Sequence, residues 1–345
     1  MAKDIQGYAG YTNKLIPFKR VQGLELSVDV LYPADSPSSP RPVVIHYHGG
    51  FLVFGDRYMF FPEWLAQACV NRGWIFVTPD YRLIPETTAH DSVQDAVDLY
   101  QWVLEVLPSH IGMTFGPVFM AGSSAGGYLA LTTSVFVEKK PAATFCLYGM
   151  LDMINKHYLI KGSNIFNLPV FDTSPIRDVL RTIRDKPVLS SYAYPENSAQ
   201  DPRLKIISSL HIDALFPDYM TGVPGLSEKV AKEGVEAIPL EHRKLFPLTF
   251  GRLDDLPPVL IVHGQNDSAV PVALSKLAAE KLQAAGVEVH AEFPDVAQHG
   301  YDRAAGRRLE SEVEGELGGA DFESLRKSLR VLDEIVARSS TTTTT

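Results

Sequence analysis

The chain has 345 residues, of which 45% are hydrophobic, and its formal net charge is −9 at pH 7. This length and apolar content allow one large α/β domain or two smaller ones. The negative charge argues against nucleic acid or an anionic membrane as a partner, because either would need a basic face. The first residues lack the apolar core of a secretory signal, and no apolar stretch is long enough to cross a bilayer. We therefore expect a cytoplasmic protein without a membrane span, either a monomer or a homodimer.

Apolar runs alternate with segments of helical period, the pattern of a mostly parallel sheet with helices on both faces. The predicted strands are, in chain order, 24–32, 43–47, 74–78, 118–120, 144–148, 259–262 and 287–293. The predicted helices are 58–72, 91–107, 125–137, 275–285 and a closing helix around 322–335. The two cysteines, Cys69 and Cys146, match neither a disulfide framework nor a metal site, so we expect both to be buried as small hydrophobic side chains.

The segment 152–256 breaks this rhythm. It is rich in Pro, Asn, Asp and isolated aromatic residues, with short helical patches such as 227–233. A structureless insert of this length is unlikely in a compact sheet. We therefore predict a cap over the carboxyl ends of the strands, where open α/β sheets bind ligands. Residues 1–151 and 257–339 would form the core and 340–345 a disordered tail, while the N-terminal segment could join either the core or the cap.

A serine framed by glycines follows the predicted strand 118–120 and precedes a predicted helix. In Gly122-Ser123-Ser124-Ala125-Gly126 the spacing is Gly-x-Ser-x-Gly. Such a turn is too sharp for larger side chains; it lifts the serine oxygen above the sheet and aims the next backbone N–H at a developing oxyanion. Only Ser124 has one glycine two positions before it and another two positions after it. We therefore predict that Ser124 is the nucleophile and that Ser123 is its neighbour. The competing interpretation is an ordinary glycine-rich turn.

A serine nucleophile needs a base and an acid that orients it. Asp267 lies in the loop after strand 259–262, and His299 lies in the loop after the last predicted strand. This matches the chain order Ser, Asp, His. The rival histidines are His290, inside the predicted strand, and His263, just before the acid loop. A turn-capping aspartate and a structural histidine remain the competing interpretations.

Two glycines after the strand 43–47 predict an oxyanion loop. In His48-Gly49-Gly50-Phe51 the absence of side chains on the glycines lets backbone N–H groups approach a carbonyl closely. We expect Gly49, Gly50 and Ala125 to donate to the oxyanion, and we expect His48 to anchor the loop through hydrogen bonds. Taken without the serine turn, a plain glycine turn would be an equally good interpretation.

These motifs together resemble the hormone-sensitive-lipase-like serine esterases of the α/β-hydrolase superfamily, the group of carboxylesterases and arylacetamide deacetylase. Three blocks carry the resemblance: His48-Gly49-Gly50-Phe51, Asp80-Tyr81-Arg82-Leu83-Ile84-Pro85-Glu86, and Gly122-Ser123-Ser124-Ala125-Gly126-Gly127. The resemblance implies an α/β-hydrolase fold with a mostly parallel eight-stranded sheet, helices on both faces and a cap insert. It also implies that Ser124, His299 and Asp267 are catalytic and that the Asp80–Glu86 block is structural.

The chain departs from the family pattern at two positions. Phe51 stands where the family has a third glycine, and Ser123 stands where it has an aspartate. We predict that Phe51 and Ser123 border the substrate, since both lie beside the expected site.

The leading hypothesis is that the protein is a serine hydrolase that cleaves a small-molecule carboxylic ester without a metal or organic cofactor. Six aromatic residues of the insert favour an apolar or aromatic ester: Phe166, Phe171, Tyr192, Tyr194, Phe216 and Tyr219. Relatives of the family leave two alternatives open. One is a lyase, dehydratase or cyclase of specialised metabolism that uses the same cleft. The other is a non-enzymatic small-molecule receptor, although the gibberellin receptors of this fold lack a complete triad.

Overall fold

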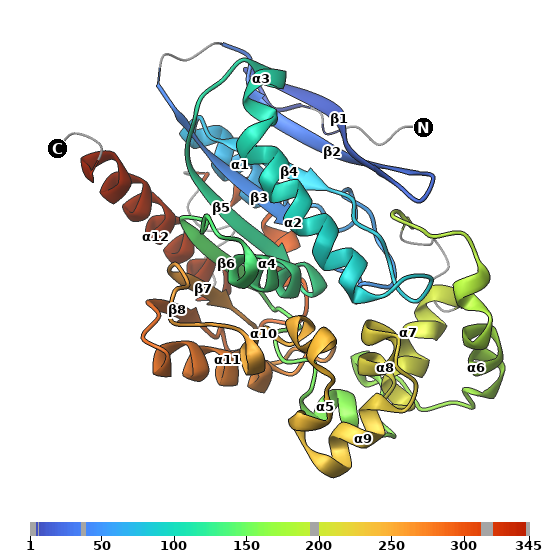
Figure 1. Ribbon diagram of the computed structural model, residues 1–345. Helices are drawn as coiled ribbons and strands as arrows, with labels where there is room; N and C mark the ends of the chain where they lie inside the picture. Colours follow the sequence, from blue (N-terminus) through green and yellow to red (C-terminus); the bar gives the residue numbers. More distant parts are fainter. Residues whose placement is uncertain (1–4, 6, 36–38, 194–199, 312–319, 343–345) are drawn as a thin grey trace.

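The computed structural model describes residues 5, 7–35, 39–193, 200–311 and 320–342. Its centre is an eight-stranded sheet with the strand order β1-β2-β4-β3-β5-β6-β7-β8 (Figure 1). The strands are β1 Tyr11–Val21, β2 Leu24–Pro33, β3 Arg41–Tyr47, β4 Ile75–Pro79, β5 Phe115–Ser123, β6 Ala143–Leu147, β7 Val259–Val262 and β8 Val289–Glu292. β2 is antiparallel to β1 and β4, and all pairs from β4 to β8 are parallel. The mostly parallel α/β sheet expected from the sequence is therefore confirmed.

The first strand, β1, was not predicted from the sequence. It is an edge strand whose burial pattern contains a single buried residue, Ile16, so it lacks the alternation of apolar and polar residues that marks a half-buried strand. β1 pairs with β2 along its length, and the Tyr11 hydroxyl donates to the Trp74 carbonyl at 3.0 Å. Residues 11–21 thus pack on the sheet.

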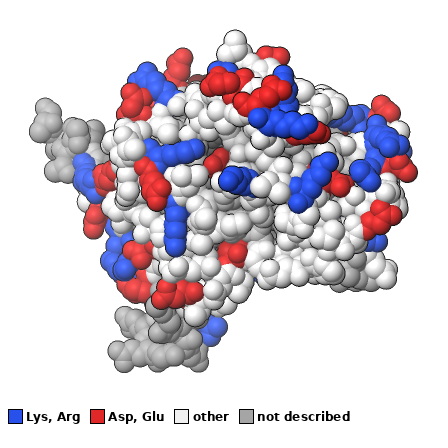
Figure 2. Space-filling model, turned by 90° about the horizontal axis from the view of Figure 1, so that it is seen from below, with Lys and Arg blue, Asp and Glu red and all other residues white. Residues whose placement is uncertain are grey.

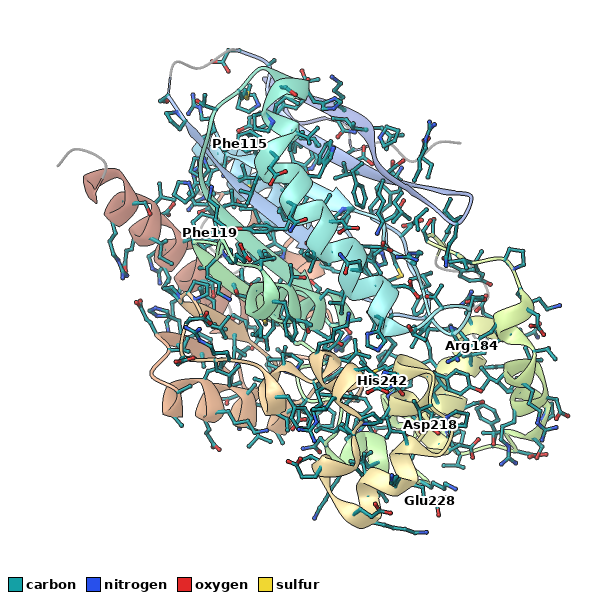
Figure 3. All side chains as sticks on the ribbon, viewed as in Figure 1. Phe115, Phe119, Arg184, Asp218, Glu228 and His242 are labelled. Carbon is teal, nitrogen blue, oxygen red and sulfur yellow. The ribbon has the colours of Figure 1, made fainter. Side chains whose placement is uncertain are left out.

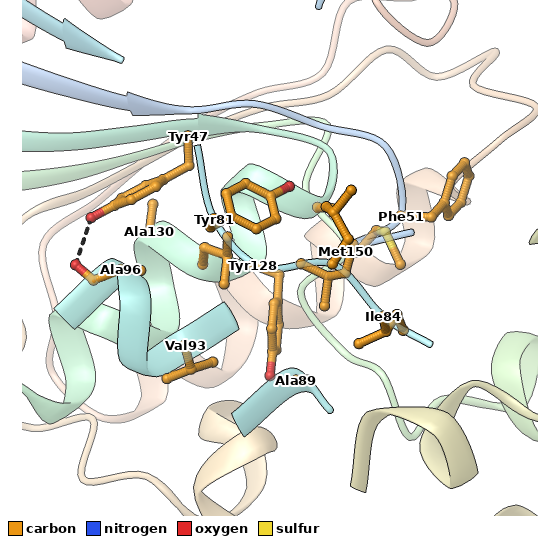
Figure 4. Close-up of a cluster of buried hydrophobic side chains, with 14 of the residues drawn as sticks. Tyr47, Phe51, Tyr81, Ile84, Ala89, Val93, Ala96, Tyr128, Ala130 and Met150 are labelled. Atoms are coloured by element: carbon orange, nitrogen blue, oxygen red, sulfur yellow. Dashed lines mark hydrogen bonds between the residues drawn. The ribbon is translucent and has the colours of Figure 1, made fainter. Parts of the chain in front are cut away.

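Helices cover both faces of the sheet. On one face lie α2 (Ala89–Glu105) and α4 (Ala125–Phe136), whose apolar side chains meet in the cluster of Figure 4, where the Tyr47 hydroxyl donates to the Ala96 carbonyl at 2.9 Å. On the other face lie α1 (Glu63–Arg72) and α12 (Ala320–Thr342). The remaining core helices are α3 (Leu107–Ile111), α11 (Val272–Ala284) and the 3-10 helix η6 (Tyr301–Arg308).

The largest differences from the predicted helix boundaries are in α1 and α12. α1 begins at Glu63 and not near Tyr58, because Pro62 disfavours a helical conformation at the residue before it. α12 continues to Thr342, into the segment predicted to be a disordered tail. Both cysteines are free and buried, as expected.

The segment between β6 and β7 is more helical than the sequence predicted. Its helices are α5 (Lys156–Leu159), η1 (Ile165–Asn167), α6 (Ser174–Arg181), η2 (Ile183–Asp185), α7 (Pro202–Ile212), α8 (Phe216–Thr221), α9 (Leu226–Glu233), η4 (Val235–Ala237), η5 (Leu240–Leu245) and α10 (Pro247–Phe250). Proline stands in the first turn of α6, α7, α8 and α10, where its missing N–H costs nothing. Four of the prolines that suggested irregular chain therefore begin helices.

These helices gather beside one end of the sheet (Figure 1). Figure 3 places Arg184, Asp218, Glu228 and His242 in this group, and Phe115 and Phe119 on β5. Figure 2 shows acidic and basic side chains interspersed on the face seen from below. Within the described ranges, no helix combines the length and apolarity needed to cross a membrane.

Candidate active site

Ser124 occupies a strained turn between the last residue of β5 and the first residue of α4. Its backbone angles are φ 57° and ψ −118°, a conformation that residues other than glycine rarely adopt. The flanking glycines are required by close packing. A Cβ atom at Gly122 would lie 2.0 Å from the Gly126 carbonyl oxygen, and one at Gly126 would lie 1.9 Å from the Tyr47 carbonyl oxygen. The structure therefore has the strand–turn–helix geometry that the Gly-x-Ser-x-Gly spacing predicted.

His299 and Asp267 meet although 32 residues separate them. His299 Nδ1 lies 2.6 Å from Asp267 Oδ2, and Asp267 Oδ1 accepts the N–H groups of Ala269 and Val270, each at 2.8 Å. Since a carboxylate only accepts, Nδ1 carries the proton and Nε2 is left as the basic nitrogen. Burial opposes the ionisation of Asp267, but hydrogen bonds from His263 and His299 outweigh it and hold the pKa of this carboxyl well below its usual range.

His263, a rival base in the sequence, is a second partner of Asp267. Its ring is fully buried, and its Nε2 lies 3.1 Å from Asp267 Oδ2 and 2.9 Å from the Val270 carbonyl oxygen. Both of these neighbours are acceptors, so Nε2 donates and Nδ1 accepts from the Ser275 hydroxyl at 2.7 Å. His263 thus contacts the same carboxylate oxygen as His299 and helps to hold it, a role that its position before the acid loop did not reveal.

The glycine loop lies directly against Ser124. A Cβ atom at Gly49 would be 3.1 Å from Ser124 Cβ and 3.8 Å from Ser124 Oγ. The loop turns through left-handed backbone at Gly50 (φ 103°) and Phe51 (φ 57°). Within the described part of the chain, the N–H groups of Gly49, Gly50 and Ala125 donate to no acceptor. They are therefore available as donors to a negatively charged oxygen beside Ser124.

His48 holds this loop in place. Its ring stacks on Tyr81 with a centroid separation of 4.2 Å, and its Nδ1 lies 2.8 Å from the Gly49 carbonyl oxygen. The Tyr81 hydroxyl donates to the carbonyls of His48 and Gly49 at 2.9 and 3.2 Å. Burial lowers the pKa of His48 to about 4, so it is neutral at physiological pH and has a structural role, as the sequence suggested.

The rest of the Asp80–Glu86 block supports the loop through ion pairs. Asp80 pairs with Arg57, and Arg82 binds Asp95 of α2 at 2.8 Å. Glu86 pairs with Arg203 of α7 at 2.5 Å, and both side chains are buried. This last pair ties the core to the segment between β6 and β7.

Ser123 and Tyr148 belong to a buried polar network behind the nucleophile. Ser123 Oγ lies 2.9 Å from His46 Nε2, so it is engaged away from the turn. The Tyr148 hydroxyl donates to Asp302 Oδ1 at 2.7 Å, and the Trp64 indole N–H donates to Asp302 Oδ2 at 2.8 Å. The Tyr148 ring packs edge to face against the ring of His299, with the two centroids 4.6 Å apart. The network therefore contacts the base through Tyr148. Tyr148 and Asp302 could not be identified from the sequence, since neither lies in a recognised motif.

Ser124, His299 and the glycine loop open into one cavity of about 830 Å³. Core residues form one side, among them Gly49, Phe51, Ser123 and Tyr148. The insert supplies the other side, with Asn164, Ile165, Phe166, Leu168, Pro169, Phe171, Asp172, Pro175, Ile176, Leu204, Lys205 and Ser208. The volume and the mostly apolar lining are those of a small-molecule site.

The aromatic residues singled out in the insert divide into two groups. Phe166 and Phe171 line the cavity, and the Phe166 ring lies 6.2 Å from that of His299. Phe216 is fully buried against Phe51, while Tyr192 and Tyr219 pack beside the core. Tyr194 lies outside the described residues. Only the first group can contact a ligand in this cavity.

Phe51 also reaches a buried histidine of the insert. The ring of His211 on α7 lies 5.2 Å from that of Phe51, edge to face, and its Nδ1–H donates to the Ile207 carbonyl at 2.9 Å. Its Nε2 is buried and has no partner in the described structure. Burial lowers the pKa of His211 to about 3, whereas an exposed histidine titrates near ~6.5.

We expect His211 to make the free energy of unfolding depend on pH. Between about pH 6.5 and 3 the unfolded chain binds a proton at this position and the folded chain does not, so stability falls as the pH falls. In His211→Phe, the slope of unfolding free energy against pH should be shallower by about 1.4 kcal/mol per pH unit in that window. Urea unfolding at pH 4, 5 and 6 measures the slope. An unchanged slope would contradict a neutral buried His211.

The comparisons agree with this geometry. Residues 44–209 match a family model described as the alpha/beta hydrolase fold. Esterase B from Lactobacillus Rhamnosis (HN001) has a similar structure, with a TM-score of 0.60 over 98% of this chain and 89% of that one at 16% sequence identity. The chain has the α/β-hydrolase fold. These comparisons bear out the resemblance to hormone-sensitive-lipase-like esterases.

Two kinds of curated relative match this chain: a carboxylesterase of similar length and a much longer synthase. The probable carboxylesterase M8 of a Phoma species is 24% identical over 310 residues, which cover 80% of this chain and 85% of that protein. Methylphloroacetophenone synthase of Cladonia uncialis is 27% identical over 329 residues, which cover 85% of this chain but 12% of that protein. The chain thus spans only a small part of the length of this synthase.

Proposed function

We propose that this chain is a serine hydrolase that cleaves a carboxylic ester through the triad Ser124, His299 and Asp267. The observation that carries the proposal is the 2.6 Å contact between His299 Nδ1 and Asp267 Oδ2, made at the wall of the cavity that also contains Ser124. The relative named as a probable carboxylesterase supports the same reaction. We further propose that residues 152–256 act as a cap on a core made of residues 1–151 and 257–339.

The geometry supports a two-step reaction. Ser124 Oγ attacks the ester carbonyl while His299 Nε2 takes its proton, and the negative oxygen receives N–H donors from Gly49, Gly50 and Ala125. His299 then gives the proton to the departing alcohol, which leaves an acyl group on Ser124. Water, deprotonated by the same nitrogen, releases the acid and restores the serine.

The cavity favours an apolar or aromatic substrate. Rings of Phe51, Phe60, Phe166 and Phe171 line it, and flat faces and edges of this kind pack well against an aromatic group. One relative is named for the synthesis of methylphloroacetophenone, an aromatic ketone. We therefore propose an ester of an apolar or aromatic acid.

Hydrolysis in water enriched in ¹⁸O tests the reaction class. With p-nitrophenyl butyrate the protein should release equal amounts of p-nitrophenol and butyrate, and the butyrate should contain one oxygen from water. The absence of turnover on p-nitrophenyl esters from two to twelve carbons would contradict the proposal. Such a result, together with tight binding of an apolar ligand, would favour a receptor; turnover of such a ligand without uptake of water would favour a lyase or cyclase.

A further inference from the structure

Arg303 is an exposed residue close to the base, and two contacts hold its side chain. It follows His299 by four residues, lies in η6 and lines the cavity. Its Nε donates to the Gly300 carbonyl at 3.2 Å, and its Cζ lies 4.2 Å from the centre of the Phe60 ring. The hydrogen bond and the cation–π contact hold the guanidinium against the wall of the cavity and leave both terminal amino groups without a protein acceptor in the described structure.

The described residues that line the cavity include more basic than acidic side chains, although the chain as a whole is acidic. Arg72, Arg82 and Arg203 pair with carboxylates, but in the described residues neither Arg303 nor Lys205 has an acidic partner within 4.0 Å. Asp172 is the one acidic residue among the lining residues that the structure describes. Its Oδ1 already accepts the Ser174 N–H and hydroxyl at 3.0 and 2.7 Å. Two unpaired cations therefore face one engaged carboxylate in a chain of net charge −9.

We propose that Arg303, assisted by Lys205, binds an anionic group of the substrate, either a carboxylate or a phosphate. The inference rests on the proposed function and deepens it by naming a substrate class: an apolar or aromatic ester that also carries a negative charge. A guanidinium presents two parallel N–H donors that match the two oxygens of such a group. The Phe60 contact orients this fork before the ligand arrives, which reduces the entropy lost on binding.

A second role for Arg303 must be separated from this one. Its positive charge opposes the burial that raises the pKa of the neighbouring Asp302. A guanidinium that served only to balance Asp302 would affect His299, and hence every substrate, to the same extent. The ratio of kcat/KM for an anionic ester to that for its neutral analogue removes this common effect.

Three substrate pairs locate the anion and distinguish its chemistry. Mono-p-nitrophenyl suberate against its methyl ester places a carboxylate on the acyl side. 4-Acetoxybenzoate against methyl 4-acetoxybenzoate places it on the leaving group, and 4-acetoxyphenyl phosphate against 4-methoxyphenyl acetate replaces it by a phosphate. In at least one pair, Arg303→Met should lower the anionic-to-neutral ratio tenfold or more, mainly through KM, and Arg303→Lys should retain part of the preference.

Arg184→Met is the matched control, because Arg184 is an exposed arginine of the insert that has no ion pair and does not line the cavity (Figure 3). Its anionic-to-neutral ratios should equal those of the parent protein. A fall of less than fivefold in every pair for Arg303→Met would overturn the inference, as would an equal fall in Arg184→Met.

Failure of the proposed function gives a different result. If no ester of any pair is hydrolysed, the reaction class is wrong, and calorimetric titration with 4-hydroxybenzoate and with methyl 4-hydroxybenzoate still tests the anion site. Binding of the anion should then weaken tenfold in Arg303→Met relative to binding of the neutral ester. The inference would be overturned if Arg303→Met weakened the binding of 4-hydroxybenzoate and of its methyl ester equally, or if neither compound bound to the parent protein.

Discussion

Replacing Ser124 with alanine is expected to lower kcat for ester hydrolysis by at least about 10⁴-fold and to change KM by no more than a few-fold. Loss of the nucleophile removes the whole acyl-enzyme route, while the N–H donors and the cavity that bind the substrate stay in place. The rates of p-nitrophenyl butyrate hydrolysis at saturating substrate measure the effect. Since Ser124 makes no side-chain hydrogen bond within the described structure, the variant should fold normally.

Ser123→Ala is the control for the adjacent hydroxyl. Ser123 Oγ lies 2.9 Å from His46 Nε2 and supports the turn from behind. We expect its loss to reduce kcat by about tenfold or less, the cost of one supporting hydrogen bond. Comparable losses in the two variants, or the larger loss in Ser123→Ala, would contradict the assignment of Ser124.

Gly126→Ala is expected to destabilise the folded state by about 3 kcal/mol or more. The added Cβ would lie 1.9 Å from the Tyr47 carbonyl oxygen and 2.7 Å from the His48 carbonyl oxygen. Both contacts are with backbone, at the point where β3 passes into the glycine loop, so no side-chain rotation can relieve them. The free energy of unfolding in urea measures the loss; failure to obtain folded protein is its extreme form.

Gly116→Ala is the matched substitution elsewhere in the same chain segment. A Cβ at Gly116 on β5 would have its nearest neighbour at 3.5 Å, an ordinary contact. We expect this variant to lie within about 1 kcal/mol of the parent protein. Equal stability of Gly116→Ala and Gly126→Ala would contradict the close packing of the turn on β3.

The sequence predicted the buried part of the fold well, because buried parallel strands and the helices between them have strong apolar periodicity. It missed β1, which is mostly exposed, and it underestimated the helices of the segment 152–256. In that segment the apolar residues pack against neighbours from distant parts of the chain, so short helices show little period of their own. Four of the prolines there mark helix starts, and treating proline only as a helix breaker cannot distinguish such starts from loops.

The candidate site was predictable where chemistry imposes a motif or a chain order. Ser124, Asp267, His299 and the glycine loop follow such rules. The structure brings Ser124, His299 and the glycine loop to one cavity, and Asp267 is buried behind His299. His263, Tyr148 and Asp302 were not identified, because each acts through a contact between distant segments. Tyr148 and Asp302, for example, are 154 residues apart and meet only when β6 and η6 are folded.

Reaction with a fluorophosphonate, followed by peptide mapping, tests the central claim most directly, because this reagent forms a covalent bond with an activated serine. The account predicts one adduct per chain, located on Ser124, lost in Ser124→Ala and retained in Ser123→Ala. An adduct on Ser123, or no adduct on correctly folded protein, would contradict it.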